Sequence, residues 1–300
     1  MKTKNWAIIA FFILCTCWAK AQTDIMDLIN EYAEEEPDEV AYTFKSTRII
    51  NAHSIERMQA HQLDFRINHR FGELNSGAYE LWGLDQALIS FDFGYGITDW
   101  LMVGFRRSTY EKTYDGSLKW SILRQKKGAT PMPIAMSYYT NMGVVSLKDE
   151  SLDSSFAHRL TFTHQLMVAR KFNEQVSLQI MPTYVHRNLV DFDEPNDIFA
   201  VGIGGRYKFH RRVAFMFEYF YCSHVAESRR DDTKTDYYHP LSIGFDIETG
   251  GHVFQLFVSN SRIMEEAGFL SETTGDITKG GIYFGFNISR VFAIGKHEED

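Results

Sequence analysis

Hydrophobic and polar residues alternate with a period of two along most of the chain from His61 onward. In one such stretch, Leu63, Phe65 and Ile67 alternate with Asp64 and Arg66. Sustained alternation is the pattern of a β-strand with one apolar and one polar face. It predicts strands over residues 62–71, 87–97, 100–109, 116–125, 133–145, 158–172, 175–187, 198–209, 212–224, 239–248, 252–260 and 281–292.

The connections between these strands are alternately short and long. The short ones are 98–99, 126–132, 173–174, 210–211 and 249–251; the long, polar ones are 72–86, 110–115, 146–157, 188–197, 225–238 and 261–280. Outer-membrane barrels have short periplasmic turns and longer external loops. The sequence therefore predicts an all-β fold, an antiparallel up-and-down transmembrane β-barrel of about 12 strands with both termini in the periplasm.

Charged residues fall mainly on the polar face of the predicted strands. An Arg or Lys facing lipid near the middle of the bilayer costs about 2–4 kcal/mol, whereas a lumen offers water or an opposite charge. His164 is an exception, because it lies on the apolar face in mid-strand. The candidate pore-lining residues are Asp64, Arg66, Arg70, Asp92, Arg106, Lys119, Arg206, Lys208, Glu218 and Asp246.

The N-terminus has the pattern of a cleaved signal peptide. Lys2 and Lys4 precede a short apolar run, and Ala19-Lys20-Ala21 matches the small-x-small cleavage site. Cys15 and Cys17 suggest a lipoprotein instead, but neither follows a small residue. The expected organisation is a signal peptide at 1–21, a periplasmic N-terminal segment at 22–58, the transmembrane barrel at 59–294 and a polar tail at 295–300.

The predicted periplasmic segment begins with an acidic stretch at 24–39. Ile25, Leu28, Ile29 and Tyr32 have helical spacing, but a solvated acidic tail is the favoured interpretation. Residues 40–58 are expected to form an extra strand or a segment packed at the barrel mouth. Whether the segment enters the lumen is left open.

Composition narrows the class of protein further. The 24 Phe and 15 Tyr match the demand of a lipid-facing surface with aromatic girdles. The formal net charge is −8, so no nucleic-acid partner is expected. Beyond the predicted signal only Cys222 remains, which excludes a disulfide framework.

Several stretches resemble the β-barrel family catalogued as domain of unknown function 5777, found in Gram-negative Bacteroidota. The resemblance covers residues from about Val40 to Ile294 and implies a membrane barrel, with no catalytic residues to carry over. The polar tail after Ile294 departs from barrels that end on an aromatic strand residue. The matching stretches are Ala41–Glu56, Phe65–Gly72, Gly83–Ala87, Phe93–Leu101, Tyr114–Trp120 and Phe286–Phe292.

Candidate chemistry in the sequence is weak. A Ser–His hydrolase is disfavoured because Ser223 and His224 are neighbours, which point to opposite faces of a strand. The acidic loop 188–197, with Asp191, Asp193 and Asp197, departs from the calcium-loop pattern. The glycines at 202–205 lie within a strand, not in a phosphate-binding loop. No cofactor and no metal is expected, and an enzyme is not favoured.

The leading functional hypothesis is a narrow outer-membrane channel or carrier for small solutes. The alternative is a closed structural or interaction barrel that acts through the external loops 225–238 and 261–280. A membrane hydrolase is the weakest hypothesis. Barrels of this size either fill their lumen with side chains or leave a passage, and both alternatives stay open. Expected partners are outer-membrane lipid, the barrel assembly machinery and a small solute.

Overall fold

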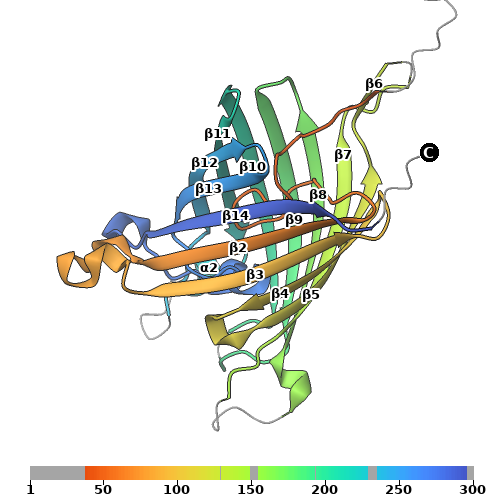
Figure 1. Cartoon of the computed structure of the whole chain (residues 1–300). Helices are drawn as coiled ribbons and strands as arrows, with labels where there is room; N and C mark the ends of the chain where they lie inside the picture. The colour runs from red at the N-terminus through yellow and green to blue at the C-terminus, as the bar shows by residue number, and fades with distance from the viewer. Residues whose placement is uncertain (1–37, 129, 149–154, 193, 229–234, 296–300) are drawn as a thin grey trace, which may run out of the picture. The chain divides into compact units, whose positions relative to one another are not determined.

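Twelve antiparallel strands close into a barrel in the computed structural model, which describes residues 38–128, 130–148, 155–192, 194–228 and 235–295 (Figure 1). Each strand pairs with its neighbour along the chain, and β14 pairs with β2 to close the sheet. The predicted fold class and strand number are therefore confirmed. The strands are β2 (Gln62–Glu73), β3 (Ala87–Gly96), β4 (Leu101–Ser108), β5 (Tyr114–Leu123), β7 (Ala135–Val144), β8 (Leu160–Lys171), β9 (Val176–Arg187), β10 (Asp197–His210), β11 (Val213–Cys222), β12 (Leu241–Thr249), β13 (His252–Ser259) and β14 (Tyr283–Ala293).

Burial alternates along the strands as the sequence pattern predicts. On β2, Asp64, Arg66 and Arg70 are buried inside the barrel, while Phe65 faces outward beside Phe91 and Phe93 of β3. Successive side chains of a strand point to opposite faces, so one face of the closed sheet becomes lumen and the other meets lipid.

Connections at the two ends of the barrel differ in length, as predicted. Tight turns follow β3, β8, β10 and β12, and short helices occupy the longer loops at the opposite end. No helix in the described part of the chain is long and apolar enough to cross a membrane. The short helices are η1 (Leu74–Ser76), η2 (Ala78–Gly83), η3 (Tyr110–Lys112), η4 (Phe156–Arg159), α2 (Val225–Ser228), α3 (Glu266–Ser271) and η5 (Ile277–Lys279).

A small separate unit contains the remaining two strands. Strand β1 (Asp38–Glu39) pairs antiparallel with β6 (Lys126–Lys127), and Lys126 Nζ lies 3.8 Å from Glu39 Oε1. Two-residue strands carry no readable period, so the sequence pattern does not predict them. The predicted signal peptide and the acidic stretch up to residue 37 lie outside the described residues.

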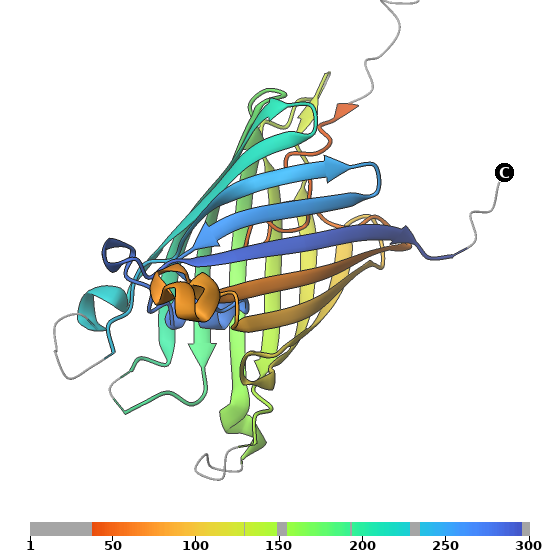
Figure 2. The ribbon, with the colours of Figure 1, turned by 60° about the vertical axis from the view of Figure 1, so that its left-hand side comes forward.

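Residues 43–56, hereafter the inner segment, fold inside the barrel (Figure 2). They form a tight reversal in which Arg48 pairs with His53, Ile49 N donates to Ala52 O at 2.8 Å, and Ser54 N donates to Thr47 O at 3.0 Å. Residues 40–58 were expected to form an extra strand or a segment packed at the barrel mouth, and their entry into the lumen was left open. Residues 43–56 lie inside because lumen-facing side chains from distant strands bind them.

Candidate functional site

The lumen gathers the predicted lining residues. The side chains of Asp64, Arg66, Arg106, Arg206 and Glu218 are buried in the barrel interior. Arg70, Lys119 and Asp246 are buried there as well, and the side chain of Asp92 is 13% exposed. Lys208 differs, because it lies near the tight-turn end of β10 and is partly exposed. A role in lining a pore stays a prediction for all ten.

Glu218 on β11 binds the tip of the inner segment. Its carboxylate accepts hydrogen bonds from the backbone N–H groups of Ile50 at 3.2 Å, Asn51 at 2.9 Å and Ala52 at 3.1 Å. An ionised carboxylate only accepts hydrogen bonds, and three consecutive amides supply donors to it. Main-chain donors thereby reach both oxygens of this buried acid.

Lys119 on β5 binds the base of the same segment. Its ammonium donates to the carbonyl oxygens of Thr47 at 3.1 Å, Ser54 at 3.1 Å and Glu56 at 2.8 Å. An ammonium has three donors and no acceptor, so these three carbonyls use its full capacity. Glu218 and Lys119 therefore bind opposite polarities of one backbone.

Amide side chains from three further strands complete the backbone contacts. Gln179 of β9 donates to His53 O at 2.7 Å, Gln255 of β13 donates to Ile49 O at 2.7 Å, and Asn287 of β14 donates to Ile50 O at 3.0 Å. Buried carbonyls need such partners because water is excluded. The segment is thus bound from around the barrel wall.

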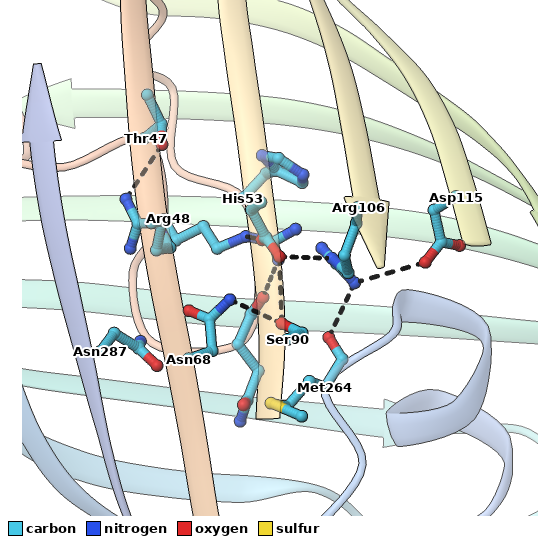
Figure 3. Close-up of polar contacts among 12 residues, drawn as sticks. Thr47, Arg48, His53, Asn68, Ser90, Arg106, Asp115, Met264 and Asn287 are labelled. Carbon is cyan, nitrogen blue, oxygen red and sulfur yellow. Dashed lines mark hydrogen bonds and ion pairs between the residues drawn. The ribbon is translucent and has the colours of Figure 1, made fainter. Parts of the chain in front are cut away.

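A cluster of ion pairs joins the inner segment to the wall and to α3. Arg48 lies 3.2 Å from Asp92 of β3 and 2.7 Å from Glu266 of α3. Arg106 of β4 lies 3.1 Å from the same two carboxylates, and it also contacts Asp115 and the carbonyl of Met264 (Figure 3). The two arginines share the carboxylates of Asp92 and Glu266, and Asp115 is a third carboxyl beside Arg106.

Apolar side chains of the inner segment pack on the other side of the lumen. Phe44, Ile49 and Ile50 belong to the buried cluster that also contains Met181 and Phe220. A Cβ added at Gly204 on β10 would lie 2.5 Å from Ile49 Cδ1, so a side chain at this position would have to displace the end of Ile49.

The inner segment and α3 leave little free space between the walls. A cavity of about 30 Å³ remains beside Arg48, His53, Arg106 and Tyr139. This is room for about two water molecules. The described residues of the inner segment and α3 thus occupy the lumen beside this cavity, and the choice between a filled lumen and a narrow passage stays a prediction.

Several residues of this site escape the sequence patterns. Asp115 falls just before the predicted strand 116–125 but is the second residue of β5 and is buried. Glu266 lies in a predicted external loop, yet α3 is buried throughout. The apolar neighbours Ile263, Met264, Phe269 and Leu270 are the sequence signal that this loop is not simply solvated.

The other candidate motifs have structural roles. Asp197 accepts hydrogen bonds from Tyr184 Oη and contacts His186 Nδ1, both at 2.6 Å, while Asp193 lies outside the described residues. Across the described ranges, no group of His, Cys, Asp and Glu suits a metal ion.

Ser223 and His224 bind different partners. The Ser223 hydroxyl accepts from Phe199 N at 3.1 Å, and His224 Nε2 lies 2.9 Å from Ser271 O. His164, the exception on the apolar face, lies beside the Tyr138 hydroxyl at 2.7 Å and the Thr140 hydroxyl at 3.1 Å. Two hydroxyl groups of the adjacent strand β7 thus contact Nδ1 of this outward-facing histidine.

The chain is similar to solved porins at low identity. The NanC porin structure is 7% identical with a TM-score of 0.47, over 76% of this chain and 98% of that chain. The KdgM porin is 7% identical with a TM-score of 0.44, over 77% and 99%. The outer membrane protein Omp33 of Acinetobacter baumannii is 7% identical with a TM-score of 0.38, over 77% and 98%.

Comparison with families gives a clearer result. None of the curated proteins compared matches the chain. The model of the family DUF5777, described as a membrane bound beta barrel domain, matches residues 44–292. This range includes nearly all of the inner segment and all but the last residue of the twelve barrel strands. The resemblance seen in the sequence is therefore confirmed: the chain belongs to the DUF5777 family of membrane-bound β-barrels.

Proposed function

We propose that this protein is an outer-membrane channel for small solutes whose lumen is closed by the inner segment in the conformation described. The observation that carries the proposal is the way the segment is held. Among the described residues, the hydrogen bonds between residues 43–56 and the wall all use a side chain on at least one partner. The segment is therefore not a strand of the sheet, and its release leaves the barrel ladder intact.

The wall behind the inner segment has the character of a water-filled passage. Removing the segment exposes Lys119 and Glu218, which direct their hydrogen bonds to it, and uncovers Asp92 and Arg106. Charged groups of both signs favour hydration, as in barrels that conduct solutes. The ten predicted lining residues belong to this proposal.

The proposed location is the outer membrane of a Gram-negative bacterium. The tight turns and both chain ends are proposed to face the periplasm, because outer-membrane barrels keep their short turns on that side. Outer-membrane lipid and the barrel assembly machinery are the proposed partners during insertion. The inner segment then enters the lumen from the periplasmic side.

Single-channel conductance in a planar lipid bilayer tests the proposal. The variant lacks residues 22–56, so that the predicted signal is joined to Arg57, and heat-modifiable gel migration shows that the barrel is folded. We expect discrete openings in this variant and a mostly closed wild-type protein. Folded barrels that lack residues 22–56 and show no conductance would contradict the channel hypothesis.

A locked variant gives the matched control. Ile49→Cys combined with Gly204→Cys places two thiols where the side chain of Ile49 meets the backbone of β10. Once mass spectrometry shows the disulfide, we expect no openings until a reductant is added. Conductance in the oxidised protein equal to that of the wild type would show that the inner segment does not close the lumen.

A second candidate is the closed barrel that acts through its external loops. Tyr79, 93% exposed, and Trp82, 55% exposed, lie on η2 and offer aromatic contacts to a partner. Two results together would favour the interaction barrel. The folded truncated barrel would show no conductance, and replacement of residues 77–84 by Gly and Ser would abolish a cellular phenotype of the protein.

A further inference from the structure

We propose that the lumen wall is a binding site for peptide backbone, and that the solute that replaces the inner segment is a short peptide. This inference rests on the proposed channel function and names its substrate class. The lumen wall already holds a peptide, namely the reversal formed by residues 47–54. The contacts to that peptide show which chemistry the wall recognises.

Every residue from 47 to 54 presents main-chain polar groups to wall side chains. Glu218 accepts from the N–H groups of residues 50, 51 and 52. Lys119 donates to the carbonyls of residues 47 and 54 and reaches that of 56, and Gln179 donates to that of 53. Gln255 reaches the carbonyls of 48 and 49, and Asn287 that of 50.

These five wall side chains come from strands spread around the barrel. They lie on β5, β9, β11, β13 and β14, so the backbone is bound from several directions rather than along one sheet edge. Backbone groups are common to all peptides, so contacts of this kind tolerate many sequences. The wall is therefore suited to a class of ligand rather than to one sequence.

The apolar side of the lumen favours a peptide over a carbohydrate. Phe44, Ile49 and Ile50 pack into the buried cluster with Met181 and Phe220. A peptide supplies polar backbone to Glu218 and Lys119 and apolar side chains to this cluster. A neutral sugar offers hydroxyl groups to the polar side but leaves much of the apolar side uncovered.

Other contacts explain why the resident segment occupies the site. Arg48 pairs with Asp92 and Glu266, Thr47 Oγ1 donates to Asp64 at 2.6 Å, and Asn51 Nδ2 donates to Ser242 at 2.9 Å. These contacts depend on side-chain identity and favour this segment over other peptides. Attachment to the barrel adds a high effective concentration.

The test measures peptide binding to the truncated barrel that lacks residues 22–56. The probes are a synthetic peptide of residues 43–56, a peptide of the same composition in scrambled order, and a neutral trisaccharide. Calorimetry in detergent and current block in a bilayer are recorded for each. We expect both peptides to bind the truncated barrel and to block its current. The Kd of the scrambled peptide should lie within about tenfold to a hundredfold of the Kd of the native-order peptide, and the trisaccharide should not block the current.

Point variants connect binding to the wall. In the truncated barrel, we expect Glu218→Gln and Lys119→Met each to weaken both peptides by at least about tenfold, because each removes charged hydrogen bonds to backbone. Thr163→Val is the matched control. The Thr163 side chain is buried on the lumen side of β8, and its hydroxyl has no hydrogen-bond partner among the described residues.

The outcomes separate this inference from the channel function. Openings without binding of either peptide overturn the peptide site and leave the channel standing. Binding of the native-order peptide alone also overturns it and makes residues 43–56 a dedicated plug. A silent barrel that binds both peptides rejects the channel yet retains the peptide site.

A full-length variant covers the case in which the truncated barrel fails to fold. Arg48→Ala keeps the inner segment but removes its ion pairs with Asp92 and Glu266. Excess scrambled peptide is then expected to increase hydrogen exchange at the amides of residues 50–52 at least about tenfold, because it competes for Glu218. Unchanged exchange at a saturating peptide concentration overturns the inference.

Discussion

The two sides of the lumen differ in what they present to the inner segment. Strands β2–β5 carry buried charges, among them Arg66, Asp92, Arg106 and Lys119. Strands β8–β11 carry more buried apolar side chains, together with the buried charged residues Arg187, Arg206 and Glu218. These apolar residues are Met167, Ala169, Met181, Val185, Ile198, Ala200, Ala214, Met216, Phe220 and Cys222. We call these the charged side and the apolar side.

The inner segment matches this difference with two faces of its own. Thr47 and Arg48 bind Asp64 and Asp92 on the charged side. Ile49 reaches Gly204 on the apolar side. Charge pairing gives the segment its orientation, and apolar burial adds stabilisation without direction. A lumen that holds a segment can therefore combine specific charge pairing on one side with sequence-tolerant apolar packing on the other.

The largest expected effect is on the charged side. Glu266→Ala removes the carboxylate shared by Arg48 and Arg106 and should lower the free energy of unfolding by about 3–5 kcal/mol, because two buried cations lose a partner. Denaturant unfolding followed by heat-modifiable gel migration measures it. The exposed pair of Lys171 with Glu174 is the control, and Glu174→Ala should cost no more than about 1 kcal/mol. Equal losses for the two variants would contradict the assignment.

Substitutions on the apolar side should lower the free energy of unfolding somewhat less. Met181→Ala leaves a cavity beside the inner segment and should cost about 2–4 kcal/mol, by the same measurement. Met181→Leu, which nearly conserves volume, should cost less than about 1.5 kcal/mol. A loss from Met181→Ala larger than that from Glu266→Ala would reverse the comparison and make apolar packing the main anchor.

A subtler change tests the contact between Gly204 and Ile49. Gly204→Ala places a Cβ 2.5 Å from Ile49 Cδ1 and should cost about 1–3 kcal/mol through overpacking. Ile49→Val removes that terminal methyl group. In a double-mutant cycle, the cost of Gly204→Ala should therefore fall largely away in the Ile49→Val background. Additive costs would mean that the clash lies elsewhere.

The smallest effect concerns pH and the loop that carries α3. Burial raises the pKa of the Glu265 carboxyl from 4.5 to about 7. The docked loop then binds a proton that the undocked loop has released, so docking is most stable below about pH 4.5 and weakens as pH rises to about 7. Hydrogen exchange at the Phe269 and Glu272 amides, corrected for intrinsic rates, should show opening at least about tenfold greater at pH 8 than at pH 5.

The matched control for this pH dependence is Glu265→Gln, which has no titrating carboxyl. We expect its loop opening to be the same at both pH values. The same measurement on amides of the apolar side, such as those of β10, should show no comparable change in either protein. A pH dependence that survives Glu265→Gln would assign it to another group.

The strands were predictable because their signal is local and repeated. Strand β9, expected at 175–187, is Val176–Arg187, and β13, expected at 252–260, is His252–Ser259. The inward direction of Arg106 and Glu218 also followed from alternation. Each of these conclusions depends on neighbours within one strand, where the two-residue period leaves little choice of face.

The inner segment was not predictable in the same way. Residues 43–56 lack a sustained period, and no local pattern marks Arg48, Asn51 and His53 as buried. They are buried because partners far away in the sequence meet them: Arg48 contacts Glu266, and Asn51 N contacts Glu218. A pattern within the segment carries no information about those partners.

Alternation and loop length were enough to predict a closed barrel of about twelve strands and the faces of those strands, because both are local consequences of a sheet between lipid and lumen. What occupies the lumen depends instead on contacts between residues far apart in the chain. Closure of the sheet brings Lys119 and Glu218, 99 positions apart in the chain, to opposite polar groups of one short segment. The backbone of the inner segment satisfies both charges, and this match depends on residues that only folding brings together.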